Sequence, residues 1–211
     1  AGDVLTPSAT AGTIVNGLYE TAPIQYGEAA YGYAAMHQTT VALPDLRVLT
    51  LKAADGSRFT TSVVCDKSLD LTTGQLDERW EAQAASGAKI TVQLRSVLQQ
   101  PGGNKAALAY TFTSIDYTGA LMLSKTLTPV PEVGSSADPR EAKRLAPLGM
   151  TVAHDDAQTL VATVHTHQSH QLQRLQLRAD KGLTVSALLV PGASFDYTVV
   201  ATVNPLNDVT T

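Results

Sequence analysis

The sequence has 211 residues, of which 44% are hydrophobic and 16% charged, with a net charge of −4 at pH 7. A chain of this size is sufficient for one large core, so we expect residues 1–211 to form a single domain. The charges form no block of either sign, which argues against a nucleic-acid partner, and no apolar run approaches the roughly 18 residues of a membrane span.

The first element is an aromatic, glycine-rich stretch from Gly12 to Tyr33. It has neither helical nor strict strand periodicity, and glycine and tyrosine together suit a shaped, partly exposed surface. Tyrosine rings can stack on sugars, but they can equally cap the core of a sandwich with their hydroxyls in water. The candidates for carbohydrate contact in this stretch are Asn16, Tyr19, Glu20, Tyr26, Glu28 and Tyr31.

The next part of the chain predicts a series of short β-strands separated by turns. Residues 89–99 give the clearest pattern, because Ile90, Val92, Leu94 and Ser96 face one way and the intervening residues face the other. The turn signals include Asp55-Gly56, Thr73-Gly74, Ser86-Gly87, Gly102-Gly103 and Thr118-Gly119. The predicted strands are 38–52 in two pieces around Pro44-Asp45, then 58–71, 75–84, 89–99, 105–117 and 120–128.

Cys65 is the only cysteine, so no internal disulfide is possible and we expect a reducing compartment, the cytoplasm. No neighbouring residue is identified as a base that would make its thiolate, and the favoured interpretation is a small buried hydrophobe. Trp80 is expected to be buried beside Leu76 and Ala82, rather than exposed for sugar stacking.

The segment from Pro129 to Pro147 is rich in proline and polar residues and predicts the one helical turn of the chain. Asp138 is placed to cap a turn that begins at Pro139. A connection of about 20 residues is long for a compact domain, so we expect it either to cross from one sheet to another or to hold a partner surface.

Five more strand-like runs follow, with turns at Lys181-Gly182 and Pro191-Gly192. They cover residues 149–153, 158–166, 171–179, 183–190 and 194–203. Many short strands with regular turn signals and almost no helix predict an all-β fold, a large antiparallel β-sandwich with one short helical connection.

Two runs of residues carry a family resemblance. The first is GTIVNGLYE at Gly12–Glu20, continued by Pro23-Ile24, Tyr26-Gly27-Glu28 and Tyr31-Gly32; the second is LDLTTGQL at Leu69–Leu76 with Arg79-Trp80. Together they resemble the N-terminal domain of glycoside hydrolase family 65, which contains maltose, trehalose and kojibiose phosphorylases and acid trehalases. The resemblance covers about residues 12–128 and rests on pattern alone beyond them. The glycine-rich segment that precedes the opening motif in the family, near LGNGYLGVRG, is absent here.

The resemblance implies a non-catalytic super-sandwich that belongs to a longer enzyme. In the family the general acid and the phosphate site lie in a separate α/α-barrel domain, so no catalytic residue is carried over and the present chain is expected to be inactive alone. The absence of an initiator methionine also suits an excised fragment. The implied parent acts on α-linked glucose disaccharides, most simply by inverting phosphorolysis with phosphate as co-substrate and no cofactor, although hydrolysis stays open.

Two further clusters contain residue types that can carry chemistry of their own. The carboxylates Glu20 with Glu28, or Asp77 with Glu78 and Glu81, are the pairs available for acid–base catalysis, and neither set is persuasive. His165, His167 and His170 resemble a zinc site with Asp155 or Asp156, but a polar strand edge is the favoured interpretation and we assign no metal.

Two alternatives to an enzyme domain remain open at this point. A free-standing carbohydrate-binding module would use the same tyrosines and bind oligosaccharides alone. A structural sandwich that forms a homodimer would bury an apolar patch against a copy of itself. A domain detached from its barrel would instead expose such a patch.

Overall fold

The computed structural model describes residues 12–24, 28, 31–98, 104–129 and 149–206, with the backbone alone for residues 62–65. Every regular element in these ranges is a β-strand, so the predicted all-β sandwich is confirmed. The helical turn predicted at Asp138-Pro139, the turn at Gly102-Gly103 and the side chain of Cys65 lie outside the described residues. No helix able to cross a membrane occurs in the described part of the chain.

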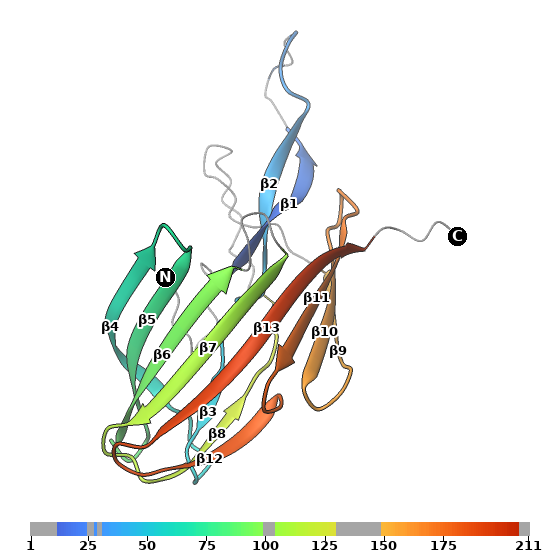
Figure 1. Ribbon diagram of the computed structural model, residues 1–211. Helices are drawn as coiled ribbons and strands as arrows, with labels where there is room; N and C mark the ends of the chain where they lie inside the picture. Colours follow the sequence, from blue (N-terminus) through green and yellow to red (C-terminus); the bar gives the residue numbers. More distant parts are fainter. Residues whose placement is uncertain (1–11, 25–27, 29–30, 99–103, 130–148, 207–211) are drawn as a thin grey trace.

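A large antiparallel sheet of eight strands forms the main layer of the molecule (Figure 1). Its strands, in spatial order, are β4 (Thr60–Asp70), β5 (Gln75–Gln83), β6 (Lys89–Leu98), β7 (Lys105–Ser114), β13 (Ser194–Leu206), β11 (Leu172–Ala179), β10 (Thr159–His165) and β9 (Gly149–His154). Neighbouring strands mostly follow one another in sequence, as a meander requires. There are two exceptions. The pairing of β7 with β13 joins the two halves of the sheet, and the pairing of β13 with β11 passes over β12, which belongs to the other sheet.

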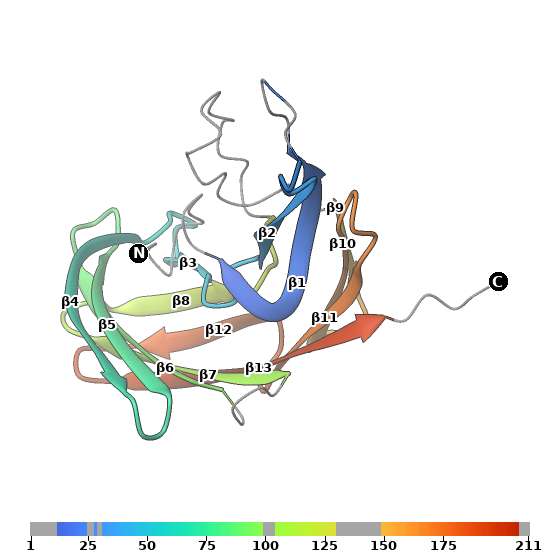
Figure 2. The ribbon, with the colours of Figure 1, turned by 90° about the horizontal axis from the view of Figure 1, so that it is seen from above.

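A second sheet of three strands forms the other layer. Its order is β12 (Thr184–Leu189), β8 (Gly119–Ser124) and β3 (Thr50–Lys52). Seen from above, the large sheet curves around this small sheet (Figure 2). The strands that flank residues 125–148 belong to different sheets, β8 to the small one and β9 to the large one, which confirms that this connection crosses between sheets.

The core lies between the two sheets and follows the alternation of the strands. Val92, Leu94 and Phe112 of the large sheet and Leu121 and Leu123 of the small sheet are all nearly inaccessible to solvent. The inward set predicted for residues 89–99 is confirmed by the burial of Ile90, Val92 and Leu94. Trp80 is also buried, as expected, at 3% exposure.

A two-stranded hairpin of β1 (Thr13–Pro23) and β2 (Met36–Leu43) projects from the body (Figure 1). The prediction that residues 12–33 are irregular was therefore wrong for the first half of the stretch. The reason is a bulge between Ile14 and Tyr19, where β1 advances by more residues than its partner strand. A bulge shifts the phase of the side chains and so removes the alternation by which a strand is recognised.

Candidate functional site

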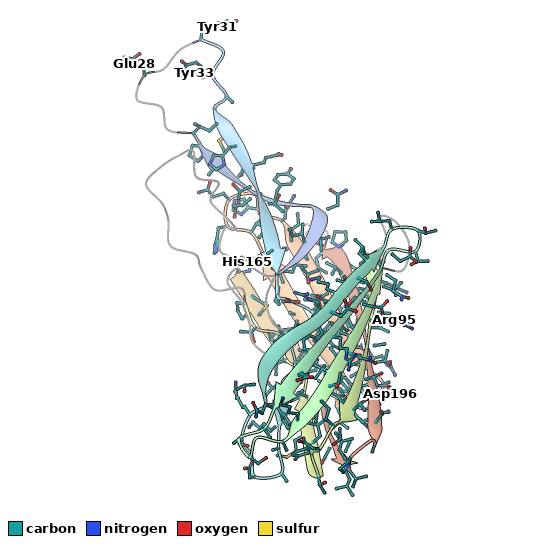
Figure 3. The ribbon with its side chains drawn as sticks, turned by 90° about the vertical axis from the view of Figure 1, so that its left-hand side faces the viewer. Glu28, Tyr31, Tyr33, Arg95, His165 and Asp196 are labelled. Atoms are coloured by element: carbon teal, nitrogen blue, oxygen red, sulfur yellow. The ribbon has the colours of Figure 1, made fainter. Side chains whose placement is uncertain are left out.

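The structure divides the predicted carbohydrate contacts between the two ends of the hairpin. Asn16, Tyr19 and Glu20 lie on β1 near the body. Glu28 and Tyr31 lie at the far tip (Figure 3). Tyr26 is outside the described residues. A single sugar ring therefore has no place within this chain where it would meet the base and the tip together.

The tip presents aromatic side chains to solvent. Tyr31 is fully exposed and Tyr33 is 56% exposed, and Met36 at the start of β2 is 51% exposed. Both tyrosines lie at the far end of the β1–β2 hairpin, remote from the large sheet (Figure 3). Large amphipathic rings held this way offer contact area to another surface at low conformational cost.

The base of the hairpin depends on Gly17 in the bulge. Gly17 has φ of +86°, a conformation that is unfavourable for residues with a Cβ. Beside it Leu18 turns into the core with 3% exposure, whereas Asn16 remains exposed. The bulge therefore lets β1 insert one apolar side chain and still continue outward as a strand.

Glu20 is bound to the turn between β10 and β11 by its carboxylate. The backbone N–H groups of His167, Gln168 and Ser169 donate to its oxygens at 2.6, 3.0 and 2.7 Å, and that of Thr21 donates at 3.0 Å. Glu20 is only 7% exposed. Burial alone would raise the pKa of Glu20, but these four backbone donors outweigh it and hold the pKa below its ordinary value.

Ser169 and Gln171 complete this contact with the backbone of β1. The Ser169 hydroxyl donates to the Tyr19 carbonyl at 2.6 Å. The Gln171 side chain accepts from the Tyr19 N–H at 3.0 Å and donates to the Gly17 carbonyl at 3.2 Å. We call Glu20, Ser169 and Gln171 the hairpin anchor, since they join β1 to a turn about 150 residues away.

The histidines near the anchor take separate positions. The rings of His165 and His167 are 5.6 Å apart and edge to face, and the His167 N–H is already bound to Glu20. Gly149 on β9 leaves room for the His165 ring, since a Cβ there would lie 1.9 Å from the nearest ring atom. Within the described ranges no group of three or more histidine, cysteine, aspartate or glutamate residues is arranged to hold a metal.

The second carboxylate set is divided between the two faces of the large sheet. Asp77 lies opposite Arg95 and accepts from it at 2.9 Å. Glu78, the next residue of β5, points inward and its side chain is 2% exposed. The alternation of a strand thus places these neighbouring carboxylates on opposite faces, where they cannot act on one bond.

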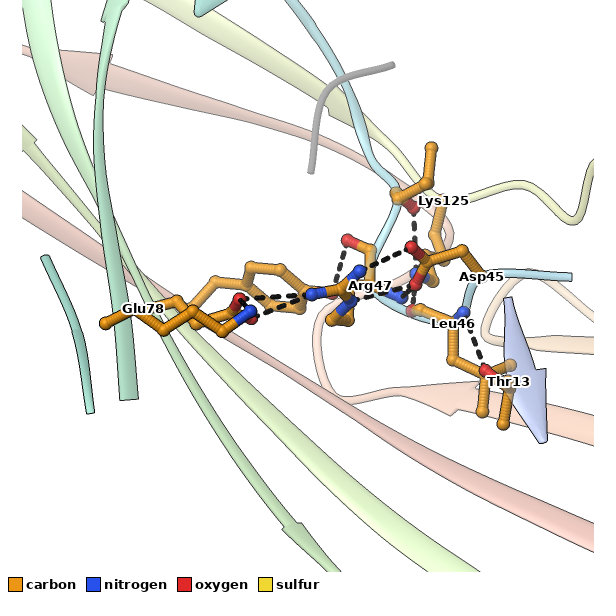
Figure 4. Close-up of polar contacts among 9 residues, drawn as sticks. Thr13, Asp45, Leu46, Arg47, Glu78 and Lys125 are labelled. Carbon is orange, nitrogen blue, oxygen red and sulfur yellow. Dashed lines mark hydrogen bonds and ion pairs between the residues drawn. The ribbon is translucent and has the colours of Figure 1, made fainter. Parts of the chain in front are cut away.

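Glu78 belongs to a buried ion cluster that sequence patterns did not indicate (Figure 4). Arg47 donates to both oxygens of Asp45, at 3.0 and 2.8 Å, and to both oxygens of Glu78, at 3.1 Å each. Lys67 contacts Glu78 at 2.7 Å. Burial would raise the pKa of Asp45, but hydrogen bonds from Arg47 hold it below its ordinary value. The cluster fixes the loop between β2 and β3 to the large sheet.

Lys125 is buried next to this cluster, with 1% exposure. Its Nζ donates to the carbonyls of Leu46 and Val48, the latter at 2.8 Å. Burial lowers the pKa of Lys125 to about 7, against an opposing effect of the Asp45 carboxylate. The partners of Lys125, and the contact between Arg47 and Glu78, are distant in sequence, so no local signal identifies them.

Comparisons with known proteins agree with this architecture. Residues 2–199 match the model of glycosyl hydrolase family 65, N-terminal domain. Two uncharacterized glycosyl hydrolases of Mycobacterium tuberculosis, from strains CDC 1551 / Oshkosh and ATCC 25618 / H37Rv, are each 27% identical over 172 residues, which is 79% of this chain and 22% of theirs. An α,α-trehalose phosphorylase of Thermoanaerobacter brockii is 24% identical over 139 residues, 64% of this chain and 18% of that protein.

A solved structure shows the same fold. The chain superposes on a putative kojibiose phosphorylase from human microbiome with a TM-score of 0.72 and 16% identity, over 95% of this chain and 27% of the other. The chain therefore spans about a fifth of the length of the curated relatives that it matches.

Proposed function

This chain belongs to the glycosyl hydrolase family 65 N-terminal domain family, and from that premise we propose that it is the non-catalytic domain of a longer, cytoplasmic enzyme. Residues 1–211 would form one structural unit in that enzyme. The observation that carries the proposal is the family match over residues 2–199, which leaves most of each relative's length to other parts of the polypeptide.

The named relatives support a proposal for the substrate class of the parent enzyme. A trehalose phosphorylase and a putative kojibiose phosphorylase are among the proteins that resemble this chain. We therefore assign the parent enzyme to α-linked glucose disaccharides, cleaved with inorganic phosphate as co-substrate.

The β1–β2 hairpin is the element of this domain that we assign to the substrate entrance. Its tip carries exposed tyrosines beyond the body, and its base is held by the hairpin anchor. An arm of this kind can present rings to a sugar bound on another domain, in the manner of aromatic stacking platforms. In that arrangement Glu20 would act on the substrate only by positioning the arm.

Activity of the 211-residue chain and of the full-length gene product on trehalose, maltose and kojibiose, each with and without phosphate, tests the proposal. We expect glucose 1-phosphate from the longer protein and no turnover by this chain alone. Activity in the shorter chain, or turnover by the longer one that does not depend on phosphate, would contradict it.

Substitution at the tip tests the role of the hairpin. Tyr31→Ala in the full-length enzyme is expected to raise KM for the disaccharide about tenfold, the loss of roughly one stacking contact of 1 to 1.5 kcal/mol. The control is Leu188→Ala, at an exposed site on β12 of the small sheet. An unchanged KM in the Tyr31 variant would remove the hairpin from the substrate entrance.

A further inference from the structure

Three exposed leucines gather at one end of the large sheet. Leu69 at the end of β4 is 56% exposed, Leu71 in the following turn is 88% exposed, and Leu98 at the end of β6 is 66% exposed. With the half-buried Leu76 at the start of β5 they form what we call the leucine rim. Single exposed leucines are ordinary on protein surfaces, but a contiguous group usually marks an interaction site.

The register of the strands places these side chains together on the inner face of the sheet. Leu69 lies opposite Leu76, and Leu76 lies opposite Ser96. Leu98 is two residues beyond Ser96 on β6 and so faces the same way, diagonal to Leu76. Leu71 continues from Leu69 into the turn of residues 71–74.

Solvent exposure along this row shows that the layer covering the core does not extend over the rim. The row runs from Leu69 through Leu76 and Ser96 to Leu108 on β7, and exposure falls from 56% at Leu69 to 3% at Leu108. These are inward positions of a sandwich sheet, which normally carry apolar residues because another layer covers them. The rim has the apolar composition of such a position, while Leu69, Leu71 and Leu98 remain open to solvent.

The position of the rim in the molecule suggests what covers it. The turn between β4 and β5 and the end of β6 lie at the end of the large sheet from which the β1–β2 hairpin projects (Figure 1). Strand β13, the last one in the described residues, also runs toward this end and finishes at Leu206. In a family whose matched domain is the N-terminal one, the polypeptide continues beyond that strand, and the match covers only 18 to 27% of the relatives and the solved structure described above.

We infer that the leucine rim is the docking surface for the polypeptide that follows this domain in the full-length protein, which covers it with apolar side chains. The inference rests on the proposed role as an N-terminal domain, but on no statement about substrate or reaction. It assigns the rim and the hairpin to the same side of the domain. The domain would then face its continuation with one apolar contact and one projecting arm.

Hydrogen exchange and thermal unfolding of the full-length protein test this inference. Peptides that cover residues 69–76 and 94–98 are expected to exchange at least tenfold more slowly in the full-length protein than in the 211-residue chain. The double substitution Leu71→Asp with Leu98→Asp should lower the unfolding midpoint of the full-length protein by about 3 °C or more and restore fast exchange in these peptides.

Leu188→Asp supplies the matched control. Leu188 is 77% exposed on β12, away from the rim, and its substitution is expected to leave the midpoint and the exchange unchanged. The double variant should also leave the midpoint of the 211-residue chain unchanged, because both of its leucines are exposed there.

Equal exchange of the rim peptides in the two wild-type proteins would overturn the inference. So would a dimer of the 211-residue chain in analytical ultracentrifugation that the double variant dissociates, since the occupant would then be a second copy. These readouts need no activity, so the two proposals fail separately. An active phosphorylase with an unprotected rim overturns the docking surface alone, and a protected rim in a protein without phosphate-dependent activity overturns the proposed function alone.

Discussion

Glu20 shows how a residue singled out for one role is placed by the structure in another. Its side chain lies in the predicted tyrosine-rich stretch, where a carboxylate among aromatic rings is typical of sugar binding. In the structure its oxygens accept from four backbone N–H groups and it is nearly buried. The prediction that Glu20 contacts carbohydrate stays a prediction, but its main contacts are with the β10–β11 turn.

Glu20→Gln is expected to lower the free energy of unfolding by about 2 kcal/mol at pH 7. The amide keeps the shape but has a single acceptor oxygen, so charged hydrogen bonds are lost and an NH₂ group faces N–H donors. Urea unfolding of the 211-residue chain measures the loss. The control is Glu28→Gln at the exposed tip, which should change stability by less than about 0.5 kcal/mol.

The pH dependence of stability in wild type and in the Glu20→Gln variant gives an independent check. Because the pKa of Glu20 is lowered on folding, its contribution is complete above the ordinary value of 4.5 and is lost as the pH falls through the folded value. The stability difference between wild type and Glu20→Gln should therefore shrink between pH 5 and pH 2. A difference that stays constant over this range would show that the charge does not contribute.

The lowered pKa of Lys125 predicts a second effect of pH on the free energy of unfolding, at neutral to alkaline pH. Its pKa is about 7 in the folded chain and 10.5 ordinarily, so between these values the unfolded chain binds more protons and stability rises with pH. The neighbouring Asp45, whose pKa is lowered, and Arg47, whose pKa is raised, keep their charges in this window, and burial raises the pKa of Tyr110 well above 10, outside it.

Lys125→Met is expected to remove this rise. Wild type should gain about 2 kcal/mol relative to the variant between pH 7 and pH 9, as measured by urea unfolding at each pH. Lys52→Met, at an exposed site on β3, should keep the wild-type slope. Parallel stability curves for wild type and Lys125→Met would mean that Lys125 does not titrate in this window.

Among the secondary-structure elements, those that follow simple rules were predicted and those that break them were not. Strands β5 and β6 alternate regularly, and the glycines of the turns at Asp55-Gly56, Thr73-Gly74 and Ser86-Gly87 all have positive φ. The hairpin was missed because the bulge in β1 interrupts its alternation. Local chemistry defines a turn, whereas a bulge becomes visible only when the partner strand is known.

Gly17→Ala is expected to destabilise the chain by about 1 to 2 kcal/mol, because Gly17 has φ of +86° and a left-handed conformation is unfavourable for alanine. No atom lies within 4 Å of the Cβ that would be added, so the cost is conformational rather than steric. Gly17→Asn should lose less, since asparagine tolerates positive φ. Urea unfolding compares the two, and an equal loss would point instead to a steric or packing effect.

For the whole molecule, the sequence was sufficient for the sandwich but not for its polar interior. The five strands predicted after residue 148 correspond to β9–β13, and the long connection joins the two sheets as expected. The ion cluster was not predictable, because Arg47 and Glu78 are 31 residues apart and each alone resembles a surface charge. The hairpin anchor joins residues 149 positions apart and was hidden for the same reason.

The pairing of β7 with β13 has a consequence for synthesis of the protein. Strand β7 ends at Ser114 and its neighbour β13 begins only at Ser194. The edge of β7 that pairs with β13 therefore stays unpaired while about 80 further residues are synthesised. At roughly 5 to 20 residues per second this takes about 4 to 16 seconds. During that time β4–β7 form a sheet with an open edge, and open edges are where chains associate wrongly. We therefore expect the nascent chain to be most prone to wrong association just before β13 emerges.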